Sequence, residues 1–376
     1  MVDGIIFSGL HDDDIPELTR ERTIASLPFA CRYRLIDFPL SNMVNSGITN
    51  VWVVAQQNYQ SLTDHLGSGK DWDLARRTGG LKIMTPYISA FAGDGMARFN
   101  SRLEALKSIS NTVYNMTSEN VVLADCDGIC NISISDMLEQ HVKTGAEITV
   151  AVKRMNVTPE RAERSVIIES DDEGRITGAL VRPKRMAGSY DVNVNVWIVT
   201  RRYLQSMLHE AFSKDFTSMS RDFICRNAGH ANYRVYRYDG YYASLTSLQD
   251  YYASSMGLLG SSEDRNSIFK VKNRPIITKV RNSTPTKYCG DSVVKNSLVA
   301  DGCVIEGTVE NSILFRGVKV GKGSVVRNSI LFQDTYIGES VELNCVIADK
   351  NVVIRDYRKL SGYETLPFCI SKGRMV

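Results

Sequence analysis

A regular alternation of short apolar pairs and polar turn residues runs through the C-terminal region of the chain. Four segments resemble one another there, and their asparagines are separated by 15, 17 and 16 residues, at Asn296, Asn311, Asn328 and Asn344. A fixed period of this length indicates one structural unit stacked on copies of itself. Each unit holds strands of about two to four apolar residues broken by turn residues, without the spacing of three and four that a helix requires. The pattern predicts a left-handed parallel β-helix over residues 289–376, with about three sides per coil.

Residues 1–260 show a different pattern, in which apolar strand-like runs alternate with amphipathic stretches. We predict strands at residues 4–8, 50–55, 120–124, 147–152 and 194–199. We predict helices at residues 37–46, 101–108 and 135–144. This order indicates a mostly parallel sheet with helices on both faces, a Rossmann-like α/β domain whose ligands bind beyond the C-terminal strand ends. Residues 261–288, which are polar and contain Pro275 and Pro285, are predicted to link this domain to the β-helix.

Composition and charge narrow the classes of function. The 376 residues are 43% hydrophobic and 23% charged, with a net charge of +3 and no run of Lys and Arg, so we expect no nucleic-acid partner. No apolar run approaches the length of a membrane span, and the N-terminus lacks the pattern of a signal peptide. The eight cysteines are scattered, without the spacing of a metal site or redox pair. We therefore expect reduced thiols, a cytoplasmic location and no membrane partner.

Several motifs of the first domain resemble one known family. The run YRLIDFPLSN at residues 33–42, followed by NSGI at 45–48, resembles the N-terminal signature of bacterial glucose-1-phosphate adenylyltransferase, or ADP-glucose pyrophosphorylase. LTRER at 18–22, Gln56 and VVLA at 121–124 continue the resemblance, and the repeats match the family's C-terminal domain. The resemblance implies a nucleotidyltransferase domain of the GT-A-like type. It also implies formation of ADP-glucose and pyrophosphate from ATP and glucose 1-phosphate with Mg²⁺, for glycogen synthesis, in tetramers under allosteric control.

The sequence departs from this family at the glycine-rich loop after the first strand. Active members carry Ala-Gly-Gly-x-Gly-Thr-Arg-Leu there, whereas this chain has SGLHDDDI at residues 8–15, so that only Gly9 remains and Asp14 replaces the Arg. We expect Asp12, Asp13 and Asp14 to face the triphosphate, and two like charges about 4 Å apart repel by roughly 4 kcal/mol near a surface. Two alternatives stay open: the three carboxylates bind a metal, or they form a solvated turn that caps the helix at Pro16.

The other positions that the resemblance assigns to chemistry are altered as well. Ile24 stands at the family's Lys, and Ser244 stands at the second metal-binding Asp. Asp127 matches the first metal-binding Asp and is a possible remnant of that site. We interpret Gly9, Gln56 and Arg182, the last from the altered sugar-phosphate motif, as remnants of substrate binding. The pattern predicts no catalytic residues and no tightly bound cofactor, with Mg²⁺ bound by a catalytic partner instead.

This combination resembles the GlgD-type subunit, which assembles with a catalytic GlgC-type subunit. The resemblance implies a hetero-oligomer, expected to be a tetramer, in which activity is expected only in the complex. Arg32 and Arg34, which flank the signature tyrosine, are candidates for binding a phosphate effector or for structural salt bridges. Three alternatives remain: a self-sufficient pyrophosphorylase with an atypical phosphate site, a free-standing sensor, and an acyltransferase of the β-helix. The last is disfavoured because all five histidines precede the repeats. A homo-oligomer of this chain also stays possible.

Overall fold

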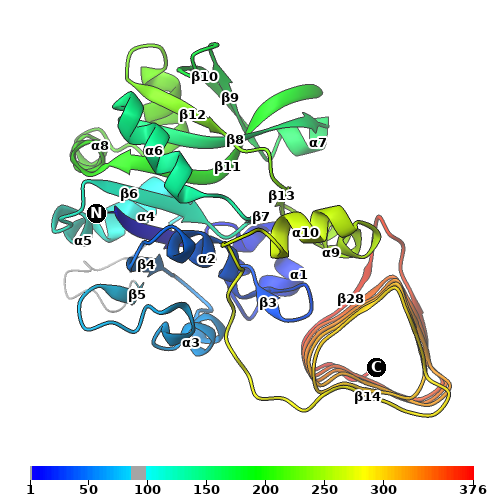
Figure 1. Ribbon diagram of the computed structural model, residues 1–376. Helices are drawn as coiled ribbons and strands as arrows, with labels where there is room; N and C mark the ends of the chain where they lie inside the picture. Colours follow the sequence, from blue (N-terminus) through cyan, green and yellow to red (C-terminus); the bar gives the residue numbers. More distant parts are fainter. Residues whose placement is uncertain (1, 86–98) are drawn as a thin grey trace.

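The computed structural model describes residues 2–85 and 99–376, which form an α/β domain followed by a three-sided parallel β-helix (Figure 1). The large sheet of the first domain has the strand order β10-β9-β11-β6-β1-β4-β5, with β8 pairing with β11 and β12. Its strands are β1 (Val2–Phe7), β4 (Asn50–Val54), β5 (Gly80–Met84), β6 (Asn120–Asp125), β8 (Ile148–Val157), β9 (Val166–Ser170), β10 (Ile176–Val181), β11 (Gly188–Thr200) and β12 (Tyr233–Arg237). Two small sheets pair β2 (Pro28–Phe29) with β3 (Tyr33–Arg34) and β7 (Gly128–Cys130) with β13 (Tyr242–Ser244).

The sheet is mixed, so the prediction of a mostly parallel sheet is wrong. Strands β5, β4, β1 and β6 run parallel, as expected for strands joined by helical crossovers. Strand β11 then pairs antiparallel with β6, β8 and β9. The apolar run at residues 194–199 marked this strand correctly, but a fully buried strand carries no sign of its direction.

Helices cover both faces of the sheet. The longer ones are α2 (Asp37–Asn45), α3 (Gln60–Leu66), α4 (Arg102–Ser108), α6 (Ile134–Thr144), α8 (Arg201–Ser213), α9 (Leu248–Gly260) and α10 (Ser262–Phe269). Short elements are η1 (Asp12–Asp14), α1 (Pro16–Thr19), η2 (Ile24–Ser26), η3 (Lys70–Trp72), α5 (Ser110–Tyr114), α7 (Pro159–Ala162) and η4 (Met219–Cys225). Successive residues of β1 point to opposite faces, with Ile5 and Phe7 in the core under α4 and α8 and Ile6 in the core under α2 and α9. Serine N-caps fix several helix starts, as where Ser101 accepts a hydrogen bond from the Glu104 backbone N–H.

The β-helix consists of three parallel sheets of five short strands each. The first holds β14 (Lys287–Tyr288), β17 (Val304–Ile305), β20 (Lys319–Val320), β23 (Tyr336–Ile337) and β26 (Val353–Ile354). The second holds β15 (Val293–Lys295), β18 (Thr308–Glu310), β21 (Val325–Arg327), β24 (Glu342–Asn344) and β27 (Lys359–Ser361). The third holds β16 (Leu298–Val299), β19 (Ile313–Leu314), β22 (Ile330–Leu331), β25 (Val346–Ala348) and β28 (Phe368–Ile370).

The repeated asparagines form one corner of the coil. Asn296, Asn311 and Asn328 have φ values of 42°, 45° and 46°, in the left-handed region that Asn tolerates better than most residues. The next coil places Cys345 at this corner, with φ 51°, because Arg327 pairs with Asn344. The alignment of Asn344 with the three preceding asparagines of the repeat is therefore wrong by one residue. Asn344 still accepts a hydrogen bond from Asn328 Nδ2, over 2.9 Å.

The stretch predicted as a plain linker contains helix α10, which packs in the core of the first domain through Ile268. The chain beyond α10 is fastened to the domain, since Ile277 N donates to Ser41 Oγ over 2.8 Å and Trp72 Nε1 donates to the Ile277 carbonyl over 3.3 Å. The strand β14 begins the β-helix within the same stretch.

Buried polar contacts join the two domains directly. Arg22 Nη2 donates to both carboxylate oxygens of Asp349 over 2.8 and 2.7 Å, and both side chains are almost fully buried. Tyr252 donates from its hydroxyl to the Asn328 carbonyl over 2.6 Å. The hydrophobic core under α9 continues into the β-helix, where Phe332 contacts Tyr251 edge to face.

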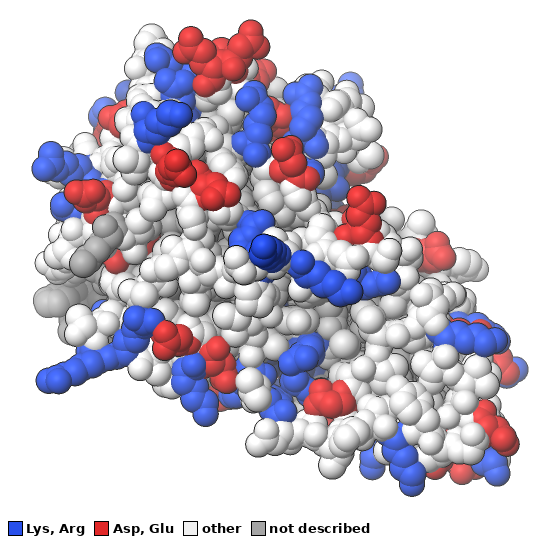
Figure 2. All heavy atoms as spheres, in the orientation of Figure 1, with Lys and Arg blue, Asp and Glu red and all other residues white. Residues whose placement is uncertain are grey.

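The charged surface, the helices and the cysteines add three observations. On the face in Figure 2, Lys and Arg side chains alternate with Asp and Glu side chains over both domains. No helix among the described residues is long and apolar enough to cross a membrane. All eight cysteines lie in the described ranges and are free thiols.

Candidate functional site

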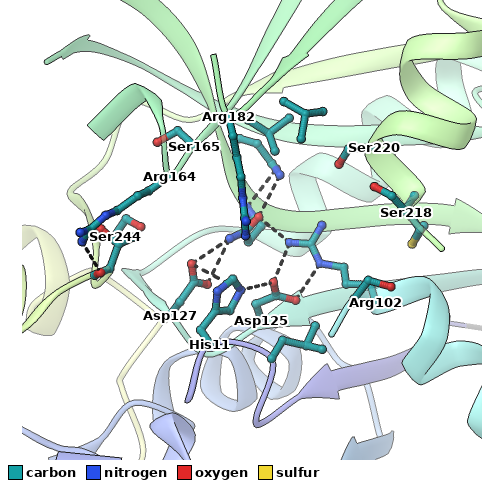
Figure 3. A pocket seen from close by; sticks show the side chains of 18 of the residues that line it. His11, Arg102, Asp125, Asp127, Arg164, Ser165, Arg182, Ser218, Ser220 and Ser244 are labelled. Atoms are coloured by element: carbon teal, nitrogen blue, oxygen red, sulfur yellow. Dashed lines mark hydrogen bonds and ion pairs between the residues drawn. The ribbon is translucent and has the colours of Figure 1, made fainter. Parts of the chain in front are cut away.

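A cavity of about 430 Å³ lies at the C-terminal ends of β1 and β6, where open α/β sheets bind their ligands. Its floor is made by the loop after β1, the loop after β6, the first turn of α4 and the middle of β11 (Figure 3). Its other walls come from residues 163–166, Arg182 and residues 217–221. The four segments of the floor, which are far apart in the sequence, thus meet at one site.

His11 stands at the centre of the floor. Its Nδ1 lies 3.1 Å from Asp14 Oδ2, and its Nε2 lies 3.0 Å from Asp125 Oδ2 and 3.8 Å from Asp127 Oδ2. Burial lowers the pKa of His11, but the charge of Asp127 and hydrogen bonds to the other two carboxylates outweigh it and raise the pKa well above its usual value. The imidazole therefore lies among three carboxylates that favour its charged form.

Arg102, at the start of α4, is the second cation of the floor. Its Nε and Nη2 donate to Asp125 Oδ1 and Oδ2 over 2.7 and 2.8 Å, and Nη2 also donates to Asn195 Oδ1. The guanidinium lies 5.1 Å from the centroid of the Trp197 ring, within range of a cation–π contact. Burial raises the pKa of Asp125, but Arg102 and His11 outweigh it and lower the pKa.

A bulge in β11 aims an amide at the third floor carboxylate. The register with β8 shifts between Asn193 and Trp197, and Asn195 takes a left-handed φ of 63°. Asn193 Oδ1 accepts from the Asn195 backbone N–H and from Trp197 Nε1, each over 3.0 Å. Asn195 Nδ2 then donates to Asp127 Oδ1 and Oδ2 over 3.1 and 2.9 Å. Burial raises the pKa of Asp127, although His11 opposes the rise.

The three carboxylates of the acidic turn have different surroundings. Only Asp14 of the three lines the cavity, so the expectation that all of them face it is wrong. Asp12 is buried and its Oδ1 accepts the Ile24 backbone N–H over 2.7 Å, while Asp13 is exposed to solvent. The alternative of a cap on the helix at Pro16 also fails in its simple form, because Ile15 is the N-cap of α1 and no side chain bonds there.

The other predicted site residues fall into two groups. Asp127, Arg182 and Ser244 line the cavity together with Asp14. Ile24 does not, because its side chain is fully buried in the core under α2.

Gly9 and Gln56 lie beside the cavity and contact each other. Gln56 Nε2 donates to the Gly9 carbonyl over 3.1 Å, which ties the loop after β1 to the end of β4. A Cβ at Gly9 would lie 3.1 Å from Asp12 Oδ2, so the glycine keeps room for the buried carboxylate. Both residues support the loop. Their role as substrate-binding remnants stays a prediction.

Sequence reasoning missed His11, Arg102, Asp125 and Asn195. Asp125 could have been found, because residues 125 and 127 stand two apart at a strand end and so share a face. The other three depend on contacts between distant segments and on the bulge in β11, which no local pattern announces.

Arg32 and Arg34 line a second, much smaller pocket of about 30 Å³ between the first domain and the β-helix. Arg281, Arg316 and Lys350 complete its cationic lining. Arg34 Nη1 donates to the Ser61 carbonyl and hydroxyl over 2.5 and 3.0 Å, and burial lowers the pKa of Arg34 to about 10. Burial and the nearby arginines lower the pKa of Lys350 to about 7. The pocket therefore gathers five basic side chains, of which Arg316 is paired with Asp301 over 3.0 Å.

The floor of the large cavity does not fit the Mg²⁺ site that the resemblance implies. Mg²⁺ prefers oxygen ligands in octahedral geometry, and active members of the resembled family supply two carboxylates. Ser244 provides no second carboxylate at the position that the resemblance assigns. The side chains gathered around Asp127 are those of Asp125 and His11, and Mg²⁺ binds a histidine nitrogen poorly.

Comparison with known proteins agrees with this arrangement of domains. Residues 4–256 match the family described as Nucleotidyl transferase, and residues 284–364 match the family described as GlmU-like, C-terminal hexapeptide. The hexapeptide match confirms the left-handed parallel β-helix predicted from the repeats.

Individual relatives place the chain more narrowly. It is 32% identical over 370 residues to the glycogen biosynthesis protein GlgD of Bacillus subtilis (strain 168), covering 98% of this chain and 95% of that one. It is 35% identical over 330 residues to the protein of that name from Geobacillus stearothermophilus, covering 86% and 82%. It is 30% identical over 340 residues to glucose-1-phosphate adenylyltransferase of Clostridium perfringens (strain 13 / Type A), covering 89% and 84%. The chain therefore belongs to the glucose-1-phosphate adenylyltransferase family and is of the GlgD type.

Proposed function

We propose that this chain is a noncatalytic partner subunit of a glucose-1-phosphate adenylyltransferase in glycogen biosynthesis. Its similarity to two glycogen biosynthesis proteins named GlgD supports the pathway. The observation that carries the noncatalytic role is the ion-paired floor of the cavity, where His11 and Asp14 stand in the loop that should hold the nucleotide phosphates.

Transfer of a nucleotidyl group needs positive charge and backbone N–H groups around the developing negative charge. On this floor the cations are already engaged, because Arg102 holds Asp125 through two hydrogen bonds and His11 bridges two carboxylates. A triphosphate would have to displace these pairs and lie against Asp14. Each approach of two like charges to about 4 Å opposes binding by roughly 4 kcal/mol near a surface.

The cationic pocket between the domains supports a regulatory contribution. Arg32 and Arg34, the effector candidates, share it with Lys350 from the β-helix, so a bound phosphate would contact both domains. Binding of such a ligand would change the contact between the two domains, and this change could be transmitted to other subunits of an assembly.

The test is to purify the chain alone and with a catalytic homologue of the same family. Alone, it should not form ADP-glucose from ATP, Mg²⁺ and glucose 1-phosphate. Together, the two chains should co-purify as one oligomer whose activity or effector response differs from that of the catalytic chain alone. Turnover by the lone chain at the rate of a competent enzyme would overturn the proposal and favour a self-sufficient pyrophosphorylase.

Charge reversal at the loop separates these two functions further. For a noncatalytic subunit, Asp14→Arg leaves the lone chain inactive or begins to restore ATP binding, because it removes a repulsive carboxylate from the cavity. For a self-sufficient enzyme that uses Asp14, the same change abolishes activity. Asp13→Arg is the matched control, since Asp13 lies in the same turn but does not line the cavity.

A further inference from the structure

The floor of the large cavity gathers three metal-ligating side chains from two loops. His11 follows β1, Asp125 ends β6 and Asp127 lies in the loop after β6, and one donor atom from each lies within 4.8 Å of the others. We propose that these three residues bind one divalent cation of the Zn²⁺ class. In the proposed site the metal replaces the Mg²⁺ of active relatives and fastens the two loops together. Only Asp127 is shared with the metal-binding positions that the family resemblance assigns.

The distances suit a tetrahedral ion. Bonds of about 2.0–2.1 Å from nitrogen and oxygen ligands to Zn²⁺ place neighbouring ligand atoms about 3.3 Å apart. His11 Nε2 lies 3.0 Å from Asp125 Oδ2 and 3.8 Å from Asp127 Oδ2, on either side of that separation. The donor atoms of Asp125 and Asp127 lie within 4.8 Å of each other, so rotation of these carboxylates would bring all three atoms to bonding distance.

Each of the three proposed ligands also forms a hydrogen bond with a neighbouring side chain that would not contact the metal. Asp14 Oδ2 lies 3.1 Å from His11 Nδ1, which leaves Nε2 turned toward the carboxylates (Figure 3). Arg102 holds Asp125, and Asn195 holds Asp127 through both carboxylate oxygens. Metal-binding histidines almost always donate their second N–H to a carboxylate or carbonyl, and such outer partners orient the ligands.

The charge of the floor favours a dication. Three carboxylates surround His11, those of Asp14, Asp125 and Asp127, and Arg102 is paired with one of them. An excess of buried negative charge is costly unless it is paired, and a divalent ion at this position would pair it.

The chemistry of the donors decides the class of ion. One nitrogen and two carboxylate oxygens suit Zn²⁺ and its neighbours in the first transition row, whereas Mg²⁺ and Ca²⁺ prefer oxygen alone. Three protein ligands leave a fourth position, and the floor faces the cavity. A water molecule or an anionic ligand in the cavity would complete the coordination there.

The test uses Co²⁺ as a spectroscopic substitute for Zn²⁺ in the full-length chain stripped of metal with a chelator. We expect one Co²⁺ per chain, with the visible absorption of a tetrahedral ion, and displacement of Co²⁺ by Zn²⁺ but not by excess Mg²⁺. Asp127→Asn keeps the shape of the side chain and should weaken binding by more than about 100-fold, whereas loss of the outer partner in Asp14→Asn should weaken it by about 10-fold.

Two controls make the result decisive. His230→Ala removes an exposed histidine outside the cavity and should bind Co²⁺ as the unaltered chain does. His11→Ala should lose the absorption band, and thermal unfolding of this variant shows whether its fold is intact. If it is not, Co²⁺ binding by the Asp127→Asn chain decides the test. Absence of the band in the unaltered chain, or equal binding by the His230→Ala and Asp127→Asn chains, would overturn the proposal. Neither result depends on whether the chain is catalytic, because no nucleotide is present.

Discussion

At the scale of single residues, the chemistry of the cavity is decided by pairs of opposite charge. The resemblance assigned Asp14, Asp127, Arg182 and Ser244 to the site, and all four line the cavity. It did not predict the contacts of Arg102, whose partners lie on β6 and β11. Nor did the acidic turn behave as a unit, since Asp12 turns inward to the Ile24 backbone. Adjacent residues of one loop can therefore differ in role: Asp12 stabilises the backbone behind the loop, whereas Asp14 faces the cavity.

The pair of Arg102 and Asp125 gives a test of these buried charges. Their side chains are 10% and 2% exposed, so removing Arg102 leaves the buried Asp125 carboxylate with His11 alone as its cationic partner. Arg102→Met should lower the free energy of unfolding by about 3 kcal/mol in metal-free buffer, measured by chemical denaturation. Adding Asp125→Asn should recover most of the loss. A double variant no more stable than the single one would contradict this assignment.

His141, in helix α6, predicts a dependence of stability on pH. It is 1% exposed, its Nδ1 lies 2.7 Å from Thr149 Oγ1, and burial lowers its pKa to about 4. The unfolded chain takes up the proton near pH 6.5 and the folded chain only near pH 4, so protonation favours unfolding between these values. Stability should therefore fall as the pH drops through this window, by at most about 3 kcal/mol from this residue.

Comparison of the unaltered chain with His141→Gln isolates this contribution. Denaturation at several pH values between 4 and 7 should give a shallower loss of stability for the variant, because the other titrating groups are common to both chains. Parallel curves would show that His141 does not titrate in this window.

At the scale of elements, the repeats predicted the β-helix but not its register. The period was visible because each coil repeats Asn-Ser-Ile or a close variant at one corner. The register of the fourth coil was predicted one residue too early. Asn344 is the same residue type as the earlier corner residues, but Cys345 has the left-handed backbone conformation of the corner. Likewise, α10 was missed because eight polar-rich residues beside a proline-containing stretch resemble a linker.

Asn311 tests the contribution of the left-handed corner. Its φ is 45°, and its Oδ1 accepts a hydrogen bond from Asn296 Nδ2 over 2.8 Å. Asn311→Ala should lower the free energy of unfolding by about 1–2 kcal/mol, because a Cβ is strained in this conformation. Asn311→Gly should lose less, since glycine adopts positive φ without that strain. Equal loss in both variants, measured by chemical denaturation, would mean that the side-chain ladder matters more than the backbone.

At the scale of the whole molecule, the two domains behave as one body because their cores join. The sequence predicted both domains but not their contact, which depends on charges 327 residues apart in Arg22 and Asp349. This contact also lies next to the cationic pocket, because Lys350, which lines the pocket, directly follows Asp349. Docking of the β-helix thus shapes the place where an effector is proposed to bind.

Asp349→Asn should loosen this docking. It removes the charge that balances the buried Arg22, and breaking a buried pair costs about 3–5 kcal/mol. We expect calorimetry to show the two domains unfolding in separate transitions and a protease to cut more readily within residues 270–286. Asp356→Asn, within the β-helix but outside this pair, is the control. A single unshifted transition in the Asp349→Asn chain would contradict the coupling.

Equilibrium binding of ATP with Mg²⁺ to the purified lone chain tests the central claim most directly. An anion cradle rebuilt from carboxylates and ion pairs should give no binding tighter than about 1 mM by calorimetry, and Asp14→Arg should not weaken what remains. Binding in the micromolar range by the unaltered chain, abolished by Asp14→Arg, would show that the cavity holds the triphosphate and that the chain is not an inert subunit.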